Sequence, residues 1–193
     1  MAKPPQEGKL LYHLTSLYNV ESIFRKGLIA RNDLNGFDDV AEPEIIDHRE
    51  VMDLNGFVPF HFFAGTPFDG AVQNAYSDKD FVFITICRTF AEKNKFRILT
   101  QHPLSLVDCS TLPYDQGFNS IQWEIMNQRN YNDRICKEIC MAECLSPITV
   151  KPSDFFCVFT PNDRVNKEVE KLRNSILGRG AFLVNINEAF FIK

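Results

Sequence analysis

The chain has 193 residues, of which 45% are hydrophobic and 24% are charged, and its formal net charge is −4. This composition is typical of a globular protein, and the length favours one substantial core over two. The negative charge excludes a general attraction to phosphate backbones or anionic membranes, so any contact with nucleic acid has to be local. We expect a short disordered leader over residues 1–10 and a single domain over residues 11–193.

The amino-terminal segment Met-Ala-Lys-Pro-Pro lacks the apolar stretch of a secretory signal, and no apolar run reaches the roughly 18 residues that span a bilayer. The six cysteines include no Cys-x-x-Cys pair, and a chain of this length does not depend on disulfides. We therefore expect reduced thiols, a cytoplasmic location and no membrane contact.

Three of the cysteines, Cys136, Cys140 and Cys144, are spaced four residues apart. On one continuous helix they would form a stripe of thiols that could suggest a metal. We expect the chain to change from helix to strand near Ala142, which breaks the stripe, and no nearby histidine completes a ligand set. The sequence therefore predicts buried structural cysteines and no metal site.

The first predicted strand covers residues 12–15, Tyr-His-Leu-Thr. Side chains two residues apart on a strand share a face, so His13 and Thr15 would form a polar clamp. A short helix follows and ends at Gly27, which can adopt the left-handed conformation that closes a helix. Its apolar positions recur at helical spacing: Leu17, Val20, Ile23 and Phe24.

The rest of the chain mixes strands and helices without regular βαβ alternation, which favours an α+β sandwich or split barrel over a doubly wound sheet. A polar, acidic stretch over residues 31–53 predicts a long binding loop. The predicted strands then cover 57–63, 81–87, 96–99, 104–107, 142–145, 155–159 and 182–192. The predicted helices cover 67–76, 119–126, a stretch around 134, and 161–176.

Each polar residue of interest also has a simple structural interpretation. Glu143 interrupts an apolar strand, which is costly unless the carboxylate is paired, for example with Arg134, or faces a cleft. His13 alone could be a structural hydrogen-bonding residue, and Arg49 a charged loop residue. The phenylalanines of residues 57–63 could simply be core. These residues indicate a function only when they are considered together.

In combination the motifs resemble the DarT-like DNA ADP-ribosyltransferases, from about residue 11 to the carboxyl terminus. The family motifs Tyr-His-Ile-Thr, Tyr-Val-Pro-Phe-Tyr-Phe and Ala-Glu-x-Leu are matched in order. The matching segments are residues 12–15, residues 57–62 (Phe-Val-Pro-Phe-His-Phe) and residues 142–145 (Ala-Glu-Cys-Leu). Between them, Asn19, Ile23, Gly27, Leu28 and Arg49 also agree with the family pattern.

The resemblance implies an ADP-ribosyltransferase-like split β-sandwich with flanking helices. It also implies an enzyme that takes NAD as substrate, transfers ADP-ribose to a base in single-stranded DNA and releases nicotinamide. Glu143 and Arg49 would be catalytic, with Arg49 also gripping phosphate. The cofactor pocket would include His13, Thr15, Asn19, Gly27, Leu28, Arg49 and Phe62. A toxin or phage-defence role, with a macrodomain-type ADP-ribosyl hydrolase as antitoxin, is implied as well.

The sequence also departs from the family pattern. Residues 63–65 read Phe-Ala-Gly where members commonly have Asn-Pro-Arg, so recognition of the acceptor could differ. No mid-chain histidine matches the extra active-site histidine of some members, and Tyr114–Asn119 occupy about that region. The expected local positive patch for nucleic acid comprises Arg129, Arg134, Lys137 and Lys151. The alternatives are a transferase of the same fold acting on RNA or protein, and a catalytically silent module that binds NAD or nucleic acid.

Overall fold

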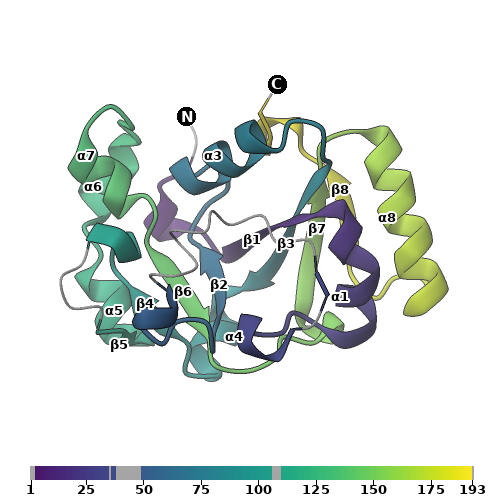
Figure 1. Ribbon diagram of the computed structural model, residues 1–193, viewed down its shortest axis with the longest axis horizontal. Helices are drawn as coiled ribbons and strands as arrows, with labels where there is room; N and C mark the ends of the chain where they lie inside the picture. The colour runs from purple at the N-terminus through teal and green to yellow at the C-terminus, as the bar shows by residue number, and fades with distance from the viewer. Residues whose placement is uncertain (1–2, 35, 38–48, 106–109, 193) are drawn as a thin grey trace.

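The computed structural model describes residues 3–34, 36–37, 49–105 and 110–192, and its strands form one eight-stranded sheet in the order β5-β4-β6-β2-β1-β3-β7-β8. Helices flank this sheet (Figure 1). Neighbouring strands are antiparallel except for β7 and β8, which are parallel and connected through helix α8. The predicted α+β class is confirmed. The strands are β1 (Leu10–Ser16), β2 (Val58–His61), β3 (Phe81–Cys87), β4 (Arg97–Leu99), β5 (Leu112–Pro113), β6 (Glu143–Ser146), β7 (Phe155–Thr160) and β8 (Leu183–Ile186).

The helices are α1 (Val20–Lys26), α3 (Pro67–Ala75), α4 (Arg88–Lys93), α5 (Tyr114–Ser120), α6 (Trp123–Gln128), α7 (Arg134–Ile139) and α8 (Asp163–Ile176). Helices α5, α6 and α7 lie at one end of the sheet, and helices α1 and α8 lie at the other (Figure 1). Short 3-10 turns join them: η1 (Pro5–Glu7), η2 (Leu17–Asn19), η3 (Arg31–Asp33), η4 (Pro103–Ser105), η5 (Pro152–Asp154) and η6 (Glu188–Phe190).

The sheet divides into two halves between β1 and β2. Strand β1 pairs with β3 along its whole length, from Leu10 opposite Cys87 to Ser16 opposite Phe81. Its register with β2 consists of a single pair, Tyr12 opposite His61. The strands therefore diverge on either side of this pair, as expected for a split sandwich.

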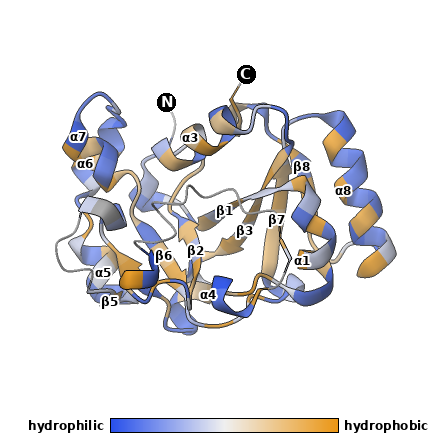
Figure 2. Cartoon of the chain, in the orientation of Figure 1, coloured by the Kyte–Doolittle hydropathy of each residue, from blue (hydrophilic) through white to orange (hydrophobic). Residues whose placement is uncertain are grey.

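Strand β3 forms the centre of the core because its side chains are apolar on both faces and Phe81–Ile86 are all buried. On one face the core includes α1 and α8, through residues such as Phe24 and Val165. On the other face Phe83 packs against the rings of Phe190 and Phe191. Figure 2 shows the hydrophobic strands inside and the alternating polar and apolar stripes of α8.

The limits of helix α8 follow from its local sequence pattern. Its Asn162 side chain accepts a hydrogen bond from the Val165 amide at 3.0 Å, which caps the first turn. Val165 and Val169 are buried, and the other face is charged. The helix lies within the predicted range 161–176.

One predicted strand is wrong over its described residues, and another is too long. Residues 103–105 form the 3-10 turn η4, and the remainder of the predicted strand 104–107 lies outside the described residues. The final strand ends at Ile186, and residues 188–190 form the 3-10 turn η6 instead. This turn brings Phe190 and Phe191 over Phe83, so burial of aromatic surface outweighs the extended preference of the apolar residues.

Three of the cysteines span the predicted change from helix to strand near Ala142. Helix α7 ends at Ile139 and strand β6 begins at Glu143, so Cys136, Cys140 and Cys144 do not share one helix. All three are buried, and every cysteine in the described part of the chain is a free thiol. Among the described helices, none has the length and apolar character to cross a membrane.

Residues 5–10, which belong to the predicted leader, form the turn η1 and the start of β1, and a buried arginine contacts this segment. The Arg88 guanidinium donates to the carbonyls of Pro5 at 2.7 Å, Gln6 at 3.0 Å, Leu10 at 3.2 Å and Phe62 at 2.9 Å. It also lies 5.2 Å above the Phe62 ring. Burial lowers the Arg88 pKa. Main-chain carbonyls and π-faces thus take the place of a carboxylate partner.

Arg88→Met should therefore destabilise the fold by about 3 kcal/mol or more, because four carbonyls would lose a charged donor. Urea denaturation monitored by tryptophan fluorescence would measure the free energy of unfolding. The exposed Arg179→Met is the matched control and should change stability by less than about 0.5 kcal/mol. Equal effects of the two substitutions would contradict the anchoring role of Arg88.

Candidate active site at the split of the sheet

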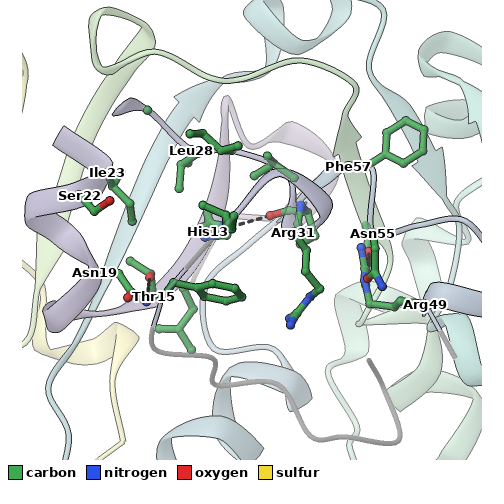
Figure 3. Close-up of a pocket in the computed structure, with 18 of the residues that line it drawn as sticks. His13, Thr15, Asn19, Ser22, Ile23, Leu28, Arg31, Arg49, Asn55 and Phe57 are labelled. Atoms are coloured by element: carbon green, nitrogen blue, oxygen red, sulfur yellow. Dashed lines mark hydrogen bonds and ion pairs between the residues drawn. The ribbon is translucent and has the colours of Figure 1, made fainter. Parts of the chain in front are cut away.

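A cavity opens where the two halves of the sheet diverge. Its walls come from β1, η2, α1 and η3 on one side and from β2, β6 and the segment around residues 49–57 on the other. Figure 3 shows His13 and Arg31 between a group comprising Thr15, Asn19 and Ser22 and a second group comprising Arg49, Asn55 and Phe57. Six of the seven predicted cofactor-binding residues line this cavity: His13, Thr15, Asn19, Gly27, Leu28 and Arg49.

His13 is held as a neutral hydrogen-bond acceptor. Its Nδ1 lies 2.8 Å from the Pro59 carbonyl oxygen, which can only accept, so Nδ1 carries the proton (Figure 3). Burial lowers the His13 pKa to about 4, which keeps the ring neutral near pH 7. Nε2 therefore retains a lone pair, able to accept from a ligand hydroxyl.

The first turn after β1 fixes the neighbouring polar groups. Asn19 Nδ2 donates to Thr15 Oγ1 at 3.3 Å, and both residues are buried. Further along, Gly27 has φ of +90°, and a Cβ there would lie 2.7 Å from the Val150 carbonyl oxygen. Glycine therefore permits the close approach at which Leu28 and Val150 form an isolated β-bridge. This bridge holds Leu28 at the cavity wall.

Arg49 and Glu143 form a buried ion pair at the opposite wall. Arg49 Nη1 lies 2.8 Å from Glu143 Oε1 and 2.6 Å from Oε2, and each residue is 6% exposed. Arg49 Nη2 also donates to the Leu54 carbonyl at 3.4 Å. The partner of Glu143 is thus Arg49 and not Arg134, which lies on the exposed surface and pairs with Glu138 at 3.7 Å.

Several cavity residues are not among the predicted site residues. Arg31 lies in the acidic stretch, and both burial and the neighbouring Arg49 charge lower its pKa. Asn55 is 6% exposed, and its Oδ1 has no hydrogen-bond partner among the described residues. His61 and His102 complete the polar lining. His61 could have been found from its position in the aromatic motif, and His102 is a mid-chain histidine that no motif marks.

Phe62, which the sequence predicts for the cofactor pocket, does not line this cavity in the structure. Its ring is 2% exposed and packs edge-on against Trp123 at 5.3 Å, within the main core and under Arg88. Phe62 comes directly after β2, whose last residue, His61, lines the cavity, and neighbouring residues of an extended chain point to opposite faces. In the part of the chain that the structure describes, the tyrosine and phenylalanine residues that line the cavity are Tyr18, Phe37, Phe57 and Phe68.

The four predicted nucleic-acid contacts do not form one patch. Arg129, Arg134 and Lys137 lie on or next to α6 and α7, with the Arg129 guanidinium 4.6 Å above the Phe63 ring. Lys151 precedes η5, which packs against α1 near the other end of the sheet (Figure 1). The turn between α6 and α7 also contacts the segment after β2, because the Tyr131 hydroxyl donates to the Gly65 carbonyl at 2.9 Å.

This arrangement is suited to bind a polar ligand with anionic and hydroxyl groups. Two arginines, a neutral histidine and an amide oxygen without a partner among the described residues line this cavity, together with further hydroxyl, amide and imidazole groups and a buried carboxylate. A carboxylate fixed in a water-poor cavity stabilises a neighbouring positive charge more strongly than it would in water. The site thus favours a reaction in which positive charge develops on the ligand.

Comparisons with known proteins agree with this geometry. A family model described as ssDNA thymidine ADP-ribosyltransferase, DarT, matches residues 12–192. The structure of Thermus sp. 2.9 DarT in complex with ADP-ribosylated ssDNA superposes with a TM-score of 0.85 at 18% identity, covering 100% of both chains. The same protein in complex with NAD+ gives 0.78 at 17% identity, covering 96% of this chain and 98% of that one.

A further structure, Thermosipho africanus DarTG in complex with ADP-ribose, gives a TM-score of 0.72 at 19% identity and covers 95% of this chain but 51% of its own. Comparison with curated protein sequences gives no match. The structural matches show that the chain has the same fold as these DarT structures. The family match shows that the chain belongs to the DarT family of ssDNA thymidine ADP-ribosyltransferases, which confirms the resemblance found in the sequence.

The buried pair allows a double-mutant cycle with Arg49→Met, Glu143→Gln and the double variant. Arg49→Met should cost about 3–5 kcal/mol, because it leaves a buried carboxylate unpaired. The coupling energy from urea denaturation should reach about 2 kcal/mol. The exposed pair of Arg25 and Glu21, also 2.8 Å apart, is the control and should give less than about 0.5 kcal/mol. Equally weak coupling in both pairs would contradict the buried interaction.

Proposed function

We propose that this chain transfers ADP-ribose from NAD to a thymidine base in single-stranded DNA and releases nicotinamide. Membership of the DarT family supports the reaction, and the Thermus relative was solved with NAD+ and with ADP-ribosylated ssDNA. The observation that carries the proposal is the buried Arg49–Glu143 pair, which lies across the cavity from His13 and Thr15. A cavity with polar groups on opposite walls suits a long substrate such as NAD.

The cofactor would be held by different groups along its length. His13 Nε2 would accept from a ribose hydroxyl and the Thr15 hydroxyl would donate to one, with Asn19 keeping the Thr15 hydroxyl in place. The unpaired Oδ1 of Asn55 can accept from a donor such as the nicotinamide carboxamide. Arg31 contributes the positive charge for the diphosphate, because it points into the cavity beside Arg49 (Figure 3). Arg49 itself is engaged by Glu143.

Glu143 would act on the step in which the bond between ribose and nicotinamide breaks. Positive charge develops on the ribose as this bond lengthens, and a carboxylate next to the sugar stabilises that charge. Both Glu143 oxygens accept from Arg49 Nη1, which fixes the carboxylate before the substrate arrives. Arg49 thus acts chiefly by positioning Glu143, which limits reorganisation during the reaction.

The acceptor strand would approach along the segment after β2. This segment, residues 63–65, runs from the cavity residue His61 to the turn between α6 and α7. Arg129, Arg134 and Lys137 supply local positive charge there, although the chain is negative overall. The exposed Tyr131 ring offers a surface on which an unpaired base can stack.

The biological setting proposed for this activity is a cytoplasmic toxin or phage-defence effector restrained by a macrodomain-type ADP-ribosyl hydrolase. The structural relative from Thermosipho africanus is a DarTG protein solved with ADP-ribose. The free thiols agree with a reducing compartment. Residues 11–193 are proposed to form one domain, which is supported by the single sheet that runs from β1 to β8.

The decisive experiment incubates labelled NAD with a thymidine-containing single-stranded oligonucleotide, the same oligonucleotide with every thymidine replaced by cytidine, an RNA and a protein lysate. Label should appear on the first acceptor alone. Glu143→Gln should lower the transfer rate by at least about 100-fold. Glu92→Gln, an exposed glutamate on α4, should leave the rate unchanged. Label on RNA or protein alone would replace the DNA assignment, and label on no acceptor would overturn the proposal.

Arg31→Met tests the proposed diphosphate contact. The loss of a charge-assisted hydrogen bond, about 1.5–3 kcal/mol, should raise KM for NAD by about 10-fold to 100-fold. The change in kcat should be smaller, because the diphosphate does not react. Steady-state kinetics with varied NAD provide the measurement. Arg25→Met, an exposed arginine on α1, is the control, and an unchanged KM in Arg31→Met would exclude the contact.

A further inference from the structure

His61 lines the cavity, but the proposed reaction gives it no role. It is the last residue of β2 and is 7% exposed. It also departs from the family motif, because residues 57–62 read Phe-Val-Pro-Phe-His-Phe where the motif has Tyr-Val-Pro-Phe-Tyr-Phe. A tyrosine stays neutral below about pH 9, whereas a histidine gains a positive charge between about pH 8 and pH 5. The cavity of this chain thus contains a ring whose charge depends on pH.

The His61 ring lies beside the carboxylate proposed to stabilise the ribose. In the register of β2 and β6, His61 is directly opposite Glu143, and both residues line the cavity. Opposite residues of an antiparallel pair project from the same face, with their Cβ atoms about 5 Å apart. A ligand group that lies next to Glu143 in the cavity therefore also comes close to the imidazole.

Phe68 extends the imidazole into an aromatic surface. Its ring comes from the first turn of α3, lines the same cavity and lies 5.6 Å from the His61 ring at an interplanar angle of 39°. The two side chains together form the His61–Phe68 wall. In the proposed reaction the bond from ribose to nicotinamide breaks beside Glu143, so the nicotinamide ring has to lie near this wall. A flat heteroaromatic ring packs well on aromatic side chains.

The position of the ring protons determines where His61 gains its charge. His61 Nδ1 lies 3.1 Å from the Ala142 carbonyl oxygen, which can only accept, so Nδ1 carries a proton in both charge states. Nε2 is therefore the atom that gains or loses a proton. The nicotinamide ring of NAD is itself positively charged, and two like charges a few ångströms apart repel strongly where water is scarce.

We propose that the nicotinamide ring of NAD packs on the His61–Phe68 wall and that protonation of His61 weakens the binding of this cationic ring. NAD then binds tightly to the neutral imidazole and poorly to the imidazolium, so its affinity falls as the pH falls. By linkage, NAD that binds to the protonated form displaces the Nε2 proton to solvent. This inference rests on the proposed use of NAD and adds to it a residue that makes cofactor binding depend on pH.

The titratable groups that face His61 from β1 and β6 do not change charge over this range. Tyr12 lies opposite His61 in β1, and burial raises its pKa, so it stays neutral. Burial lowers the pKa of His13 to about 4, so this ring also stays neutral above pH 5. Glu143, in β6, is held as a carboxylate by its ion pair with Arg49.

Two further titratable groups have to be separated from His61 by experiment. Asp69 follows Phe68 in α3, and burial raises its pKa while the His61 charge acts to lower it. His102 lines the same cavity from the chain after β4. Either group could add its own dependence on pH to the binding of NAD.

The test measures dissociation constants for the wild-type chain by isothermal titration calorimetry between pH 5 and pH 8, without DNA. The ligands are carba-NAD+, which keeps the cationic ring but cannot release it, ADP-ribose, which lacks the ring, and NADH, whose ring is uncharged. Kd for carba-NAD+ should rise by about 10-fold or more from pH 8 to pH 5. Kd for ADP-ribose and NADH should change by less than about twofold. Equal changes for all three ligands would overturn the proposal, whereas no binding of any ligand would refute the proposed use of NAD itself.

Substitutions then assign the effect to one residue. His61→Tyr, which introduces the residue of the family motif, should reduce the change in Kd for carba-NAD+ to less than about twofold. Asp69→Asn and His102→Gln are the controls and should retain the change of about 10-fold. Binding of ADP-ribose at pH 8 reports that each variant is folded. A change that persists in His61→Tyr, or that disappears in either control, would overturn the role of His61.

Discussion

The single register pair between Tyr12 and His61 is the constraint on which the rest of the structure depends. If β1 and β2 paired along their full length, the main chain would close the space that the cavity occupies. Because they meet at one point, the polar side chains of β1 face the end of β2 and β6 across a gap. The hydrogen bond from His13 to the Pro59 carbonyl spans this gap and keeps its two sides in register.

Several charged residues are buried in this fold, and each is accommodated by different partners. Arg88 has its charge spread over four carbonyls and three aromatic faces, which anchors the amino-terminal turn to the sheet. Arg49 and Glu143 neutralise each other at the cavity. Asp69 is left with an oxygen that has no partner among the described residues. The first two arrangements satisfy the charges, whereas the other oxygen of Asp69 accepts from the Thr66 amide in the capping box of α3.

The local sequence predicted those elements in which one signal dominates. Strand β3 is apolar throughout, and α8 has both a cap and a clear apolar stripe, so their limits were predictable. The carboxyl-terminal segment was mispredicted, because Phe190 and Phe191 look like strand residues but bury their rings on Phe83 from a 3-10 turn. Their preferred partner is a distant strand, which local patterning does not specify.

The sequence by itself determined the α+β class and the order of the motifs, and period-two spacing along the first strand put His13 and Thr15 on one face. Arg49 and Glu143 were predicted from the family resemblance. Only the tertiary structure decided that Arg49 pairs with Glu143, 94 positions along the chain, and that Arg31, Asn55 and His61 join them. It also moved Phe62 into the core. Contacts of this kind depend on how separate elements cross in space, and that depends on the packing of the whole sheet.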